Sequence, residues 1–194
     1  RHATSKLSND NLFEIKTLGF RGEALPSIAA VSNLKIMTKF YQEKVGSEIF
    51  VNEGKIEYKK PSSINCGTNV LVKDIFFSTP ARLKFLKSDN YEFFLIKKVL
   101  QKLALSNPKV EFNFFNNEKQ IFSSKSQNEG NFLENIKLRV RELFGSEFSN
   151  NLINLNQVRE NFRFVGLIGL PTFNFSNNSN QFICINNRIV NDRL

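Results

Sequence analysis

The pattern of hydrophobic and polar positions in the first part of the chain predicts a small sheet of short strands. Residues 34–40 alternate Leu, Ile and Thr with Lys, Met and Lys, as a strand with two different faces does. Residues 48–52 and 55–59 flank Glu53-Gly54, a pair that favours a tight hairpin turn. Residues 69–75 alternate in the same way and predict a further strand.

Other segments have the spacing of helices. Residues 23–31 predict a helix with Leu25, Ile28 and Ala29 facing the core, and Pro80 suits the start of a short helix that reaches Leu86. A longer helix is expected over 90–106. Its apolar residues recur at near-helical spacing and predict a buried stripe of Phe93, Ile96, Leu100 and Leu103.

The second half of the chain continues with alternating strands and one capped helix. Residues 110–114 and 120–123 predict a hairpin, and the polar run S-S-K-S-Q-N-E-G at 123–130 is typical of a linker. Asn131 and Glu134 have the spacing of a capping box, and Gly145 is a natural helix end. The predicted apolar face of this helix is Phe132, Ile136, Val140 and Leu143, and later strands are expected at 152–155, 162–170 and 181–185.

This order of elements predicts an α+β protein in which helices cover sheets, and 194 residues suffice for one large or two small domains. The net charge of +9 favours a polyanionic partner such as nucleic acid or nucleotide phosphate, although a lysine-rich surface gives the same balance. No apolar run is as long as a membrane span.

The rarer residues exclude several classes of site. Cys66 and Cys184 are far apart and predict neither a disulfide framework nor a metal site, so both are expected to be reduced thiols. His2 is the only histidine, and hydrolytic triads and zinc sites therefore have little support.

The most informative segment is residues 17–28, T-L-G-F-R-G-E-A-L-P-S-I. Gly19 and Gly22 allow backbone angles closed to other residues, and a helix is expected to begin directly after them. Free N–H groups of that first helical turn and the Arg21 guanidinium would then face the same loop, an arrangement that holds phosphate. An ordinary glycine turn before a helix has the same spacing.

Three further motifs accompany this loop: R-H-A-T-S-K at 1–6, G-T-N-V-L-V-K-D at 67–74 and I-F-F-S-T-P-A-R-L-K-F-L-K at 75–87. Together they resemble the MutL family of DNA mismatch-repair ATPases. The resemblance implies the second half of a GHKL-type ATPase domain with its ATP lid over 1–122. A linker at 123–130 and the truncated start of a βαβ-containing, transducer-like domain over 131–194 would follow.

The resemblance also implies which residues bind ATP. They are Thr4, Ser5, Lys6, Gly19, Phe20, Arg21, Gly22 and Thr68. Hydroxyl, ammonium and guanidinium groups of these types bind phosphate oxygens, and Thr68 would meet the adenine side. The general-base Glu, the Asn that holds Mg²⁺ and an adenine-gripping Asp-x-Gly-x-Gly motif would lie upstream of Arg1, and a lysine for the γ-phosphate beyond Leu194. We therefore expect a fragment that hydrolyses no ATP alone.

Basic residues that could neutralise DNA phosphates are Arg82, Lys84, Lys97, Lys98 and Arg188, although a solvated helix face has the same appearance. The family usually has N-G-R and then R-D near the end of this chain. Here Asn187 and Asn191 replace the glycine and the first arginine of the pair. The turn should survive because Asn tolerates left-handed angles, whereas a DNA contact at Asn191 is in doubt.

For the intact protein, the resemblance implies a bacterial cytoplasmic, nucleoid-associated ATPase that requires ATP and Mg²⁺. It would form a homodimer on ATP and couple a mismatch-sensor protein to a helicase or nuclease on DNA. One alternative is a related ATPase of the type II topoisomerase or heat-shock chaperone class. Others are a DNA-binding or scaffold module that has lost ATPase activity, or a decaying gene piece without function.

Overall fold

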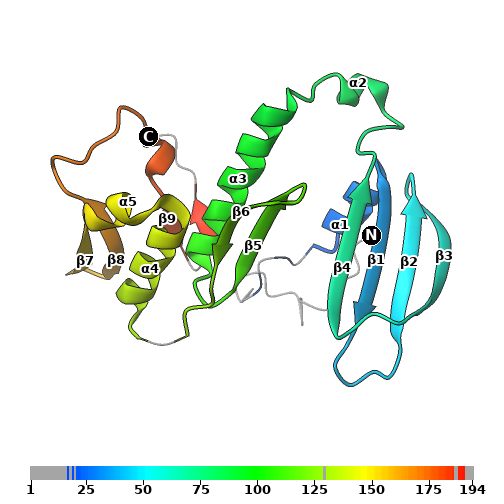
Figure 1. The fold of residues 1–194 in the computed structure, drawn as a ribbon, viewed down its shortest axis with the longest axis horizontal. Helices are drawn as coiled ribbons and strands as arrows, with labels where there is room; N and C mark the ends of the chain where they lie inside the picture. Colours follow the sequence, from blue (N-terminus) through cyan, green and yellow to red (C-terminus); the bar gives the residue numbers. More distant parts are fainter. Residues whose placement is uncertain (1–16, 18, 20, 129, 186–187, 191–194) are drawn as a thin grey trace. The chain divides into compact units, whose positions relative to one another are not determined.

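The computed structural model describes residues 17, 19, 21–128, 130–185 and 188–190. It forms two compact units, Arg1–Ser88 and Asp89–Leu194, and each is described by itself (Figure 1). Helices and antiparallel strand pairs occur in both, so the predicted α+β class is confirmed. No helix in the described part of the chain is long and apolar enough to cross a membrane.

The first unit is built on a four-stranded antiparallel sheet with the order β3-β2-β1-β4. Its elements are α1 (Ala24–Ala29), β1 (Asn33–Lys39), β2 (Gly46–Asn52), β3 (Lys55–Ser62), β4 (Gly67–Lys73) and α2 (Pro80–Leu83). The predicted strands are all present. The helix at Pro80 is shorter than expected, because the segment that was predicted to reach Leu86 is helical only as far as Leu83.

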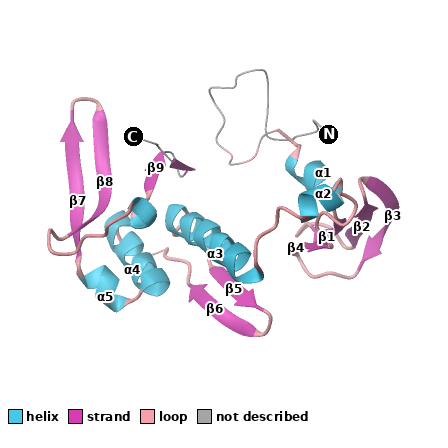
Figure 2. Ribbon diagram, turned by 90° about the horizontal axis from the view of Figure 1, so that it is seen from above, coloured by secondary structure: helices cyan, strands magenta, loops and turns pink. Residues whose placement is uncertain are grey.

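One face of this sheet packs against α1. Leu34 and Val51 lie opposite each other in the β1–β2 register and form a buried cluster with Ala29, with Ile36 and Ile49 packed beside them. Figure 2 shows α1 beside the strands of this sheet. Full burial of a Leu or Val side chain contributes about 1.5–3 kcal/mol. Leu25, which was predicted to face the core, is instead exposed, because the short α1 reaches the sheet only with its last turn.

The predicted turn at Glu53-Gly54 is confirmed, and it also anchors the helix. Both residues have positive φ angles, 46° and 79°, as the favoured two-residue hairpin turn requires. The Gly54 N–H donates to the Ala29 carbonyl oxygen at 2.8 Å, at the end of α1. The hairpin turn thereby fixes the position of α1 on the sheet.

Among the described residues, the second unit combines three α-helices with three strand pairs (Figure 1). It contains α3 (Asp89–Ser106), β5 (Phe112–Asn116), β6 (Lys119–Ser124), α4 (Phe132–Phe144), α5 (Ser146–Asn150), β7 (Leu152–Arg159), β8 (Phe162–Gly169), a 3₁₀ turn (Asn178–Asn180), β9 (Ile183–Ile185) and β10 (Arg188–Val190). The Asn131–Glu134 capping box and the end of α4 at Gly145 are as predicted. α5 and β10 were not predicted.

The core of this unit lies where the C-terminal end of α3 meets α4 and β6. Its buried apolar residues are Ala104, Leu105, Phe122, Val140 and Leu143. The predicted stripe on α3 is therefore partly wrong, since Ile96 is 50% and Leu103 40% exposed. Helical spacing gave a possible face, and half of it packs within the unit: Leu100 packs against the core, and the Phe93 ring stacks on that of Phe114. The residues of α3 that are buried are Ala104–Ser106.

Arg139 of α4 forms hydrogen bonds with the start of segment 123–130, which the sequence predicts to be a linker. Its side chain is fully buried, and it donates hydrogen bonds to four carbonyl oxygens, those of Ser124 at 3.4 Å, Pro108 at 2.5 Å, Val110 at 2.8 Å and Lys125 at 2.9 Å. Burial lowers the pKa of Arg139 below its usual value. A guanidinium with several fixed donors suits such a task, because each buried carbonyl needs a partner.

These contacts place 123–130 inside the second compact unit rather than between two units. β6 already includes Ser123 and Ser124, and its Phe122 shares a core with α4. The compact units are thus divided near residue 88, a different place from the predicted linker. The predicted domain boundaries at 1–122 and 131–194 themselves stay predictions.

Candidate functional site

The glycine loop that precedes α1 contains two glycines with different backbone needs. Gly22 has φ +63°, in the left-handed region where a Cβ atom is unfavourable. Near Gly19 a Cβ atom would meet nothing within 4 Å. The Thr17 hydroxyl donates to the Gly19 carbonyl oxygen at 2.9 Å and closes a small turn. Of the two glycines, Gly22 is therefore the one that the backbone conformation requires.

A pair of threonine hydroxyls lies at the end of the β1–β4 strand pair. Thr38 and Thr68 are opposite each other in the antiparallel register, and their Oγ1 atoms are 2.8 Å apart. The Thr38 hydroxyl is also 3.3 Å from the Gly67 carbonyl oxygen, which can accept its proton. Gly67 itself has φ +133°, which few other residues adopt. The Thr38 hydroxyl thus has two neighbours, and the Thr68 hydroxyl, which contacts Thr38, belongs to an exposed residue.

The face of the sheet that carries this pair is covered only in part. Thr38 and Thr68 lie on the same face as Leu34 and Ile36, which pack against α1 and its neighbours. On β4 the same face presents Val70, 49% exposed, and Val72, 40% exposed. Branched apolar side chains beside a hydroxyl can contact a flat apolar ring and hydrogen-bond its edge. This is the chemistry that holding a nucleobase requires.

The structure places only part of the predicted nucleotide set. Thr4, Ser5, Lys6 and Phe20 lie outside the described residues. Gly19 and Arg21 are exposed in the glycine loop, Gly22 follows them, and Thr68 lies on β4. All of these described residues belong to the first unit. Their role in binding ATP stays a prediction.

The predicted DNA contacts are distributed over both units. Arg82 lies on α2 and Lys84 directly after it, in the first unit, and both are exposed. Lys97 and Lys98 lie on α3, where the Lys98 ammonium is 4.5 Å from the centre of the Phe94 ring, and Arg188 lies on β10. No contact with DNA follows from these positions, and this role also stays a prediction.

Sequence reasoning missed a charged cluster on the other face of the same sheet. Glu48 is only 6% exposed, and its Oε1 atom is 3.0 Å from the Lys35 ammonium, 3.5 Å from that of Lys60 and 2.9 Å from the Tyr58 hydroxyl. The hydrogen bond with Lys35 lowers the pKa of Glu48, and the same bond raises the pKa of Lys35. The alternating pattern of each strand indicates which of these residues share a face, but only the pairing register of the strands shows that they are neighbours.

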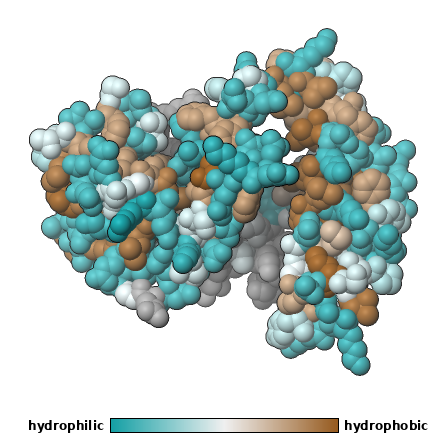
Figure 3. Space-filling view, in the orientation of Figure 1, coloured by the Kyte–Doolittle hydropathy of each residue, from teal (hydrophilic) through white to brown (hydrophobic). Residues whose placement is uncertain are grey.

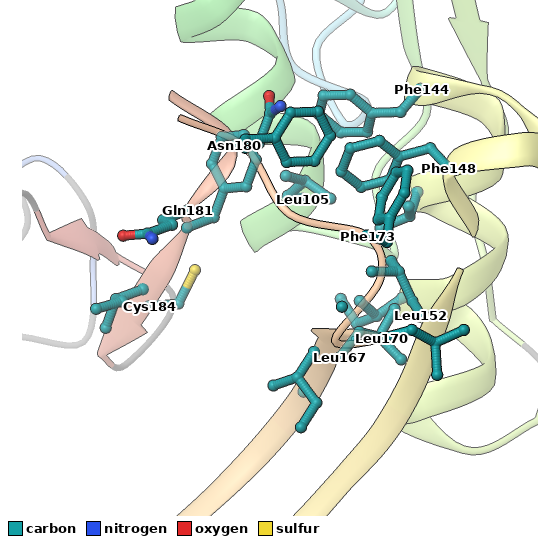
Figure 4. Close-up of a pocket in the computed structure, with 18 of the residues that line it drawn as sticks. Leu105, Phe144, Phe148, Leu152, Leu167, Leu170, Phe173, Asn180, Gln181 and Cys184 are labelled. Carbon is teal, nitrogen blue, oxygen red and sulfur yellow. The ribbon is translucent and has the colours of Figure 1, made fainter. Parts of the chain in front are cut away.

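An apolar cavity of about 760 Å³ occurs within the second unit. Rings of Phe144, Phe148 and Phe173 gather on one side of it, and Leu152 and Leu167 of the β7–β8 hairpin lie on another (Figure 4). None of its lining residues is Asp, Glu, His, Lys or Arg, and Cys184 is the one that carries a thiol. No group of three or more His, Cys, Asp or Glu side chains suited to a metal ion occurs in the described part of the chain.

Comparisons with known proteins agree on one family. Residues 140–194 match the family model of the DNA mismatch repair protein, C-terminal domain. The DNA mismatch repair protein MutL of Azorhizobium caulinodans is 43% identical over 196 residues and covers the whole chain, and that of Rickettsia typhi is 39% identical over 194 residues. The chain spans about a third of the length of these relatives, 31% and 32%.

Solved structures give the same result. The ATPase domain of Aquifex aeolicus MutL in complex with ADP is 35% identical, with a TM-score of 0.61, over 70% of this chain and 52% of that one. The N-terminal domain of a DNA repair protein is 26% identical, with a TM-score of 0.74, over 90% of this chain and 56% of that one. Both alignments extend beyond the 88 residues of the first unit.

Proposed function

Because this chain belongs to the MutL family of DNA mismatch-repair proteins, we propose that it is part of an ATP-dependent switch that couples mismatch recognition to later repair steps. In this switch the first unit binds the nucleotide, and the full-length protein, meaning one of the length of the relatives above, responds by changing its assembly. The activity would require ATP and Mg²⁺ as cofactors. It would take place in the bacterial cytoplasm, at the nucleoid.

The observation that carries this proposal is the sheet face with the Thr38–Thr68 pair, which lies in the same unit as the glycine loop. A similar solved ATPase domain is in a complex with ADP, which supports nucleotide binding by this protein. Val70 and Val72 would contact the adenine ring, while Thr68 would hydrogen-bond its edge. Gly19, Arg21 and Gly22, with Thr4, Ser5, Lys6 and Phe20, would close over the phosphates.

When Mg²⁺ is bound, it would neutralise phosphate charge during hydrolysis. The family resemblance assigns the general base and the Mg²⁺-binding asparagine to neither unit of this chain. The 194 residues alone are therefore expected to turn over no ATP. Sustained Mg²⁺-dependent phosphate release by the purified 194-residue chain, abolished by a substitution within it, would overturn this part of the proposal.

ATP binding would order the glycine loop, and the ordered loop would favour a homodimer that holds DNA and contacts a mismatch-sensor protein and a helicase or nuclease. Ordering of a loop by a γ-phosphate is an established way to switch a protein between states. Limited proteolysis of the full-length protein tests it. A non-hydrolysable ATP analogue should protect the bond after Arg21 from trypsin, while a site in the second unit, such as Lys119, keeps its cleavage rate. Equal cleavage at Arg21 with and without the analogue would contradict the proposal.

A further inference from the structure

The face of the four-stranded sheet that points away from α1 is rich in lysine. The strand register assigns to it alternate residues of each strand. We name it the lysine face, and it consists of Asn33, Lys35, Met37 and Lys39 of β1, Glu48, Phe50 and Asn52 of β2, Lys55, Tyr58 and Lys60 of β3, and Asn69, Leu71 and Lys73 of β4. Hydrophilic and hydrophobic side chains adjoin each other over the surface of this sheet (Figure 3).

The paired residues of this face include five lysines and one acidic residue, Glu48. A second carboxylate, that of Asp74 directly after β4, accepts a hydrogen bond from Asn33 at the edge of the face. Lys59, in contrast, is opposite Ile49 and belongs to the face that packs against α1. The lysines of the lysine face come from three different strands, yet strand pairing brings them onto one surface. The resulting local positive charge is a property of the register and not of any one segment of sequence.

The carboxylate of Glu48 is buried within the lysine face and is not exposed on its surface. Glu48 is buried beneath Lys35 and Lys60 and accepts from the Tyr58 hydroxyl. Lys60 also lies over the Tyr58 ring, 4.9 Å from its centre. These contacts hold two lysine side chains along the sheet while their charges still reach solvent, with 32% and 58% of the side chain exposed.

The other three lysines, Lys39, Lys55 and Lys73, make no ion pair among the described residues. Lys73 and Lys55 are at the same end of the sheet on its two outer strands, about 14 Å apart across three strand spacings. Lys35 and Lys39 are four residues apart on β1, about 13 Å along the strand. About 13 Å of duplex DNA carries roughly eight negative charges.

We propose that the lysine face binds DNA through its phosphate backbone. The contact is electrostatic and independent of base sequence, as expected for lysines without fixed acceptors. The side-chain amide of Asn69 adds a donor that can reach phosphate or sugar oxygens, whereas that of Asn33 donates to the Asp74 carboxylate at 3.1 Å. This inference rests on the DNA partner in the proposed function, but it assigns the contact to a surface separate from the nucleotide face and requires no ATP.

The test compares two double variants that lose the same charge from different places. Lys39→Gln with Lys73→Gln removes two unpaired lysines from the lysine face. Lys59→Gln with Lys119→Gln removes one lysine from the opposite face and one from β6. Binding of the 194-residue chain to a labelled 30-nucleotide strand and to the matching duplex is measured by fluorescence anisotropy between about 50 and 200 mM salt without nucleotide.

We expect the lysine-face variant to bind about 5- to 10-fold more weakly. The slope of log affinity against log salt should fall by about 1.8 for duplex and about 1.4 for the single strand. The control variant should change little in both measurements. The measurements with the single strand and with the duplex show which form of DNA the lysine face binds. Weaker binding of either form by the lysine-face variant supports the proposal. Equal losses in the two variants, or no DNA binding by the unaltered chain, would overturn it.

Glu48→Gln provides a second test with the opposite sign. It removes the negative charge buried in the face and releases Lys35 and Lys60, so DNA binding should become tighter, provided that circular dichroism shows a folded chain. Weaker or unchanged binding by folded Glu48→Gln would contradict the proposal. Displacement of the DNA by poly-glutamate at equal charge concentration would assign the face to acidic peptides instead and would also overturn it. None of these results depends on ATP binding, which is measured separately.

Discussion

The hydroxyl oxygens of Thr38 and Thr68 lie 2.8 Å apart across the β1–β4 strand pair. Thr38 has one proton and two acceptors within reach, and the contact to Thr68 is shorter than the 3.3 Å contact to the Gly67 carbonyl. A proton donated by Thr38 to Thr68 leaves the Thr68 proton for a ligand. Thr38 therefore orients the group that the proposed function assigns to the adenine edge.

The first prediction concerns this pair. Thr38→Val keeps the shape of the side chain but removes the hydrogen bond, so nucleotide affinity should fall by about 1 kcal/mol, about 5-fold. A fluorescent ATP analogue titrated into the full-length protein measures it. Thr38→Ser restores the hydroxyl and should restore affinity. If Thr38→Val has the same effect in a Thr68→Val background as alone, Thr38 does not act through Thr68.

The second prediction separates the two glycines of the loop. Gly22→Ala places a Cβ atom on a backbone with φ +63°, which costs about 1–2 kcal/mol, so nucleotide affinity should fall about 5- to 30-fold. Gly19→Ala is the matched control, because a Cβ atom there meets nothing within 4 Å. The same titration applies to both. Equal effects of the two substitutions would mean that the left-handed angle at Gly22 is not needed for binding.

The third prediction concerns Arg139 and the stability of the second unit. Arg139→Met removes the donors for four carbonyl oxygens and should lower the free energy of unfolding by about 3–5 kcal/mol, the cost of breaking a buried charged network. Urea unfolding followed by circular dichroism measures it. Arg141→Met, at an exposed position on the same helix, should change stability by less than about 0.5 kcal/mol. Similar values for both variants would contradict the role assigned to Arg139.

The fourth prediction concerns pH. The pKa of Glu48 is lower in the folded protein than the ordinary value of 4.5. Its contribution to stability is therefore fully present above pH 4.5 and is lost as the pH falls through the lowered pKa. The raised pKa of Lys35 has the opposite sense, and its contribution is lost only as the pH rises above 10.5 through that raised pKa.

The stability difference between the unaltered chain and Glu48→Gln should accordingly be present at pH 7 and shrink by pH 3. Urea unfolding at several pH values measures it. Glu57→Gln, on the same hairpin, is the control, since Glu57 has no ion pair among the described residues. A difference for Glu48→Gln that stayed constant from pH 7 to pH 3 would show that the negative charge of Glu48 does not contribute to stability.

Local patterns were sufficient for most elements. The Glu53-Gly54 turn, the Asn131–Glu134 capping box and the Gly145 helix end follow from neighbours in sequence, and all three are present. Spacing alone was not sufficient for α3, because its stripe of Phe93, Ile96, Leu100 and Leu103 depends on what packs against it. Phe93 and Leu100 pack within the second unit, whereas Ile96 and Leu103 are exposed and the adjacent Ala104 and Leu105 are buried.

For the candidate nucleotide site, too, one part could be predicted from the sequence and another part required the structure. The sequence motifs in residues 17–28 and 67–87 were sufficient to predict the family, and the comparisons with known proteins confirm this prediction. Thr38 could not be found from the sequence, because no pattern within one strand tells which residue of another strand lies beside Thr68. That information is in the register, Thr38 opposite Thr68.

By itself, the sequence determined the family, the α+β class and the positions of most strands and helices, since motifs, turns and caps are set by residues a few positions apart. The tertiary structure alone decided which side chains meet: Thr38 with Thr68, Glu48 with Lys35 and Lys60, and Arg139 with the carbonyls of 108–125. These contacts join residues 12 to 31 positions apart. Strand register and helix packing determine such neighbours, and both depend on the whole core rather than on local sequence.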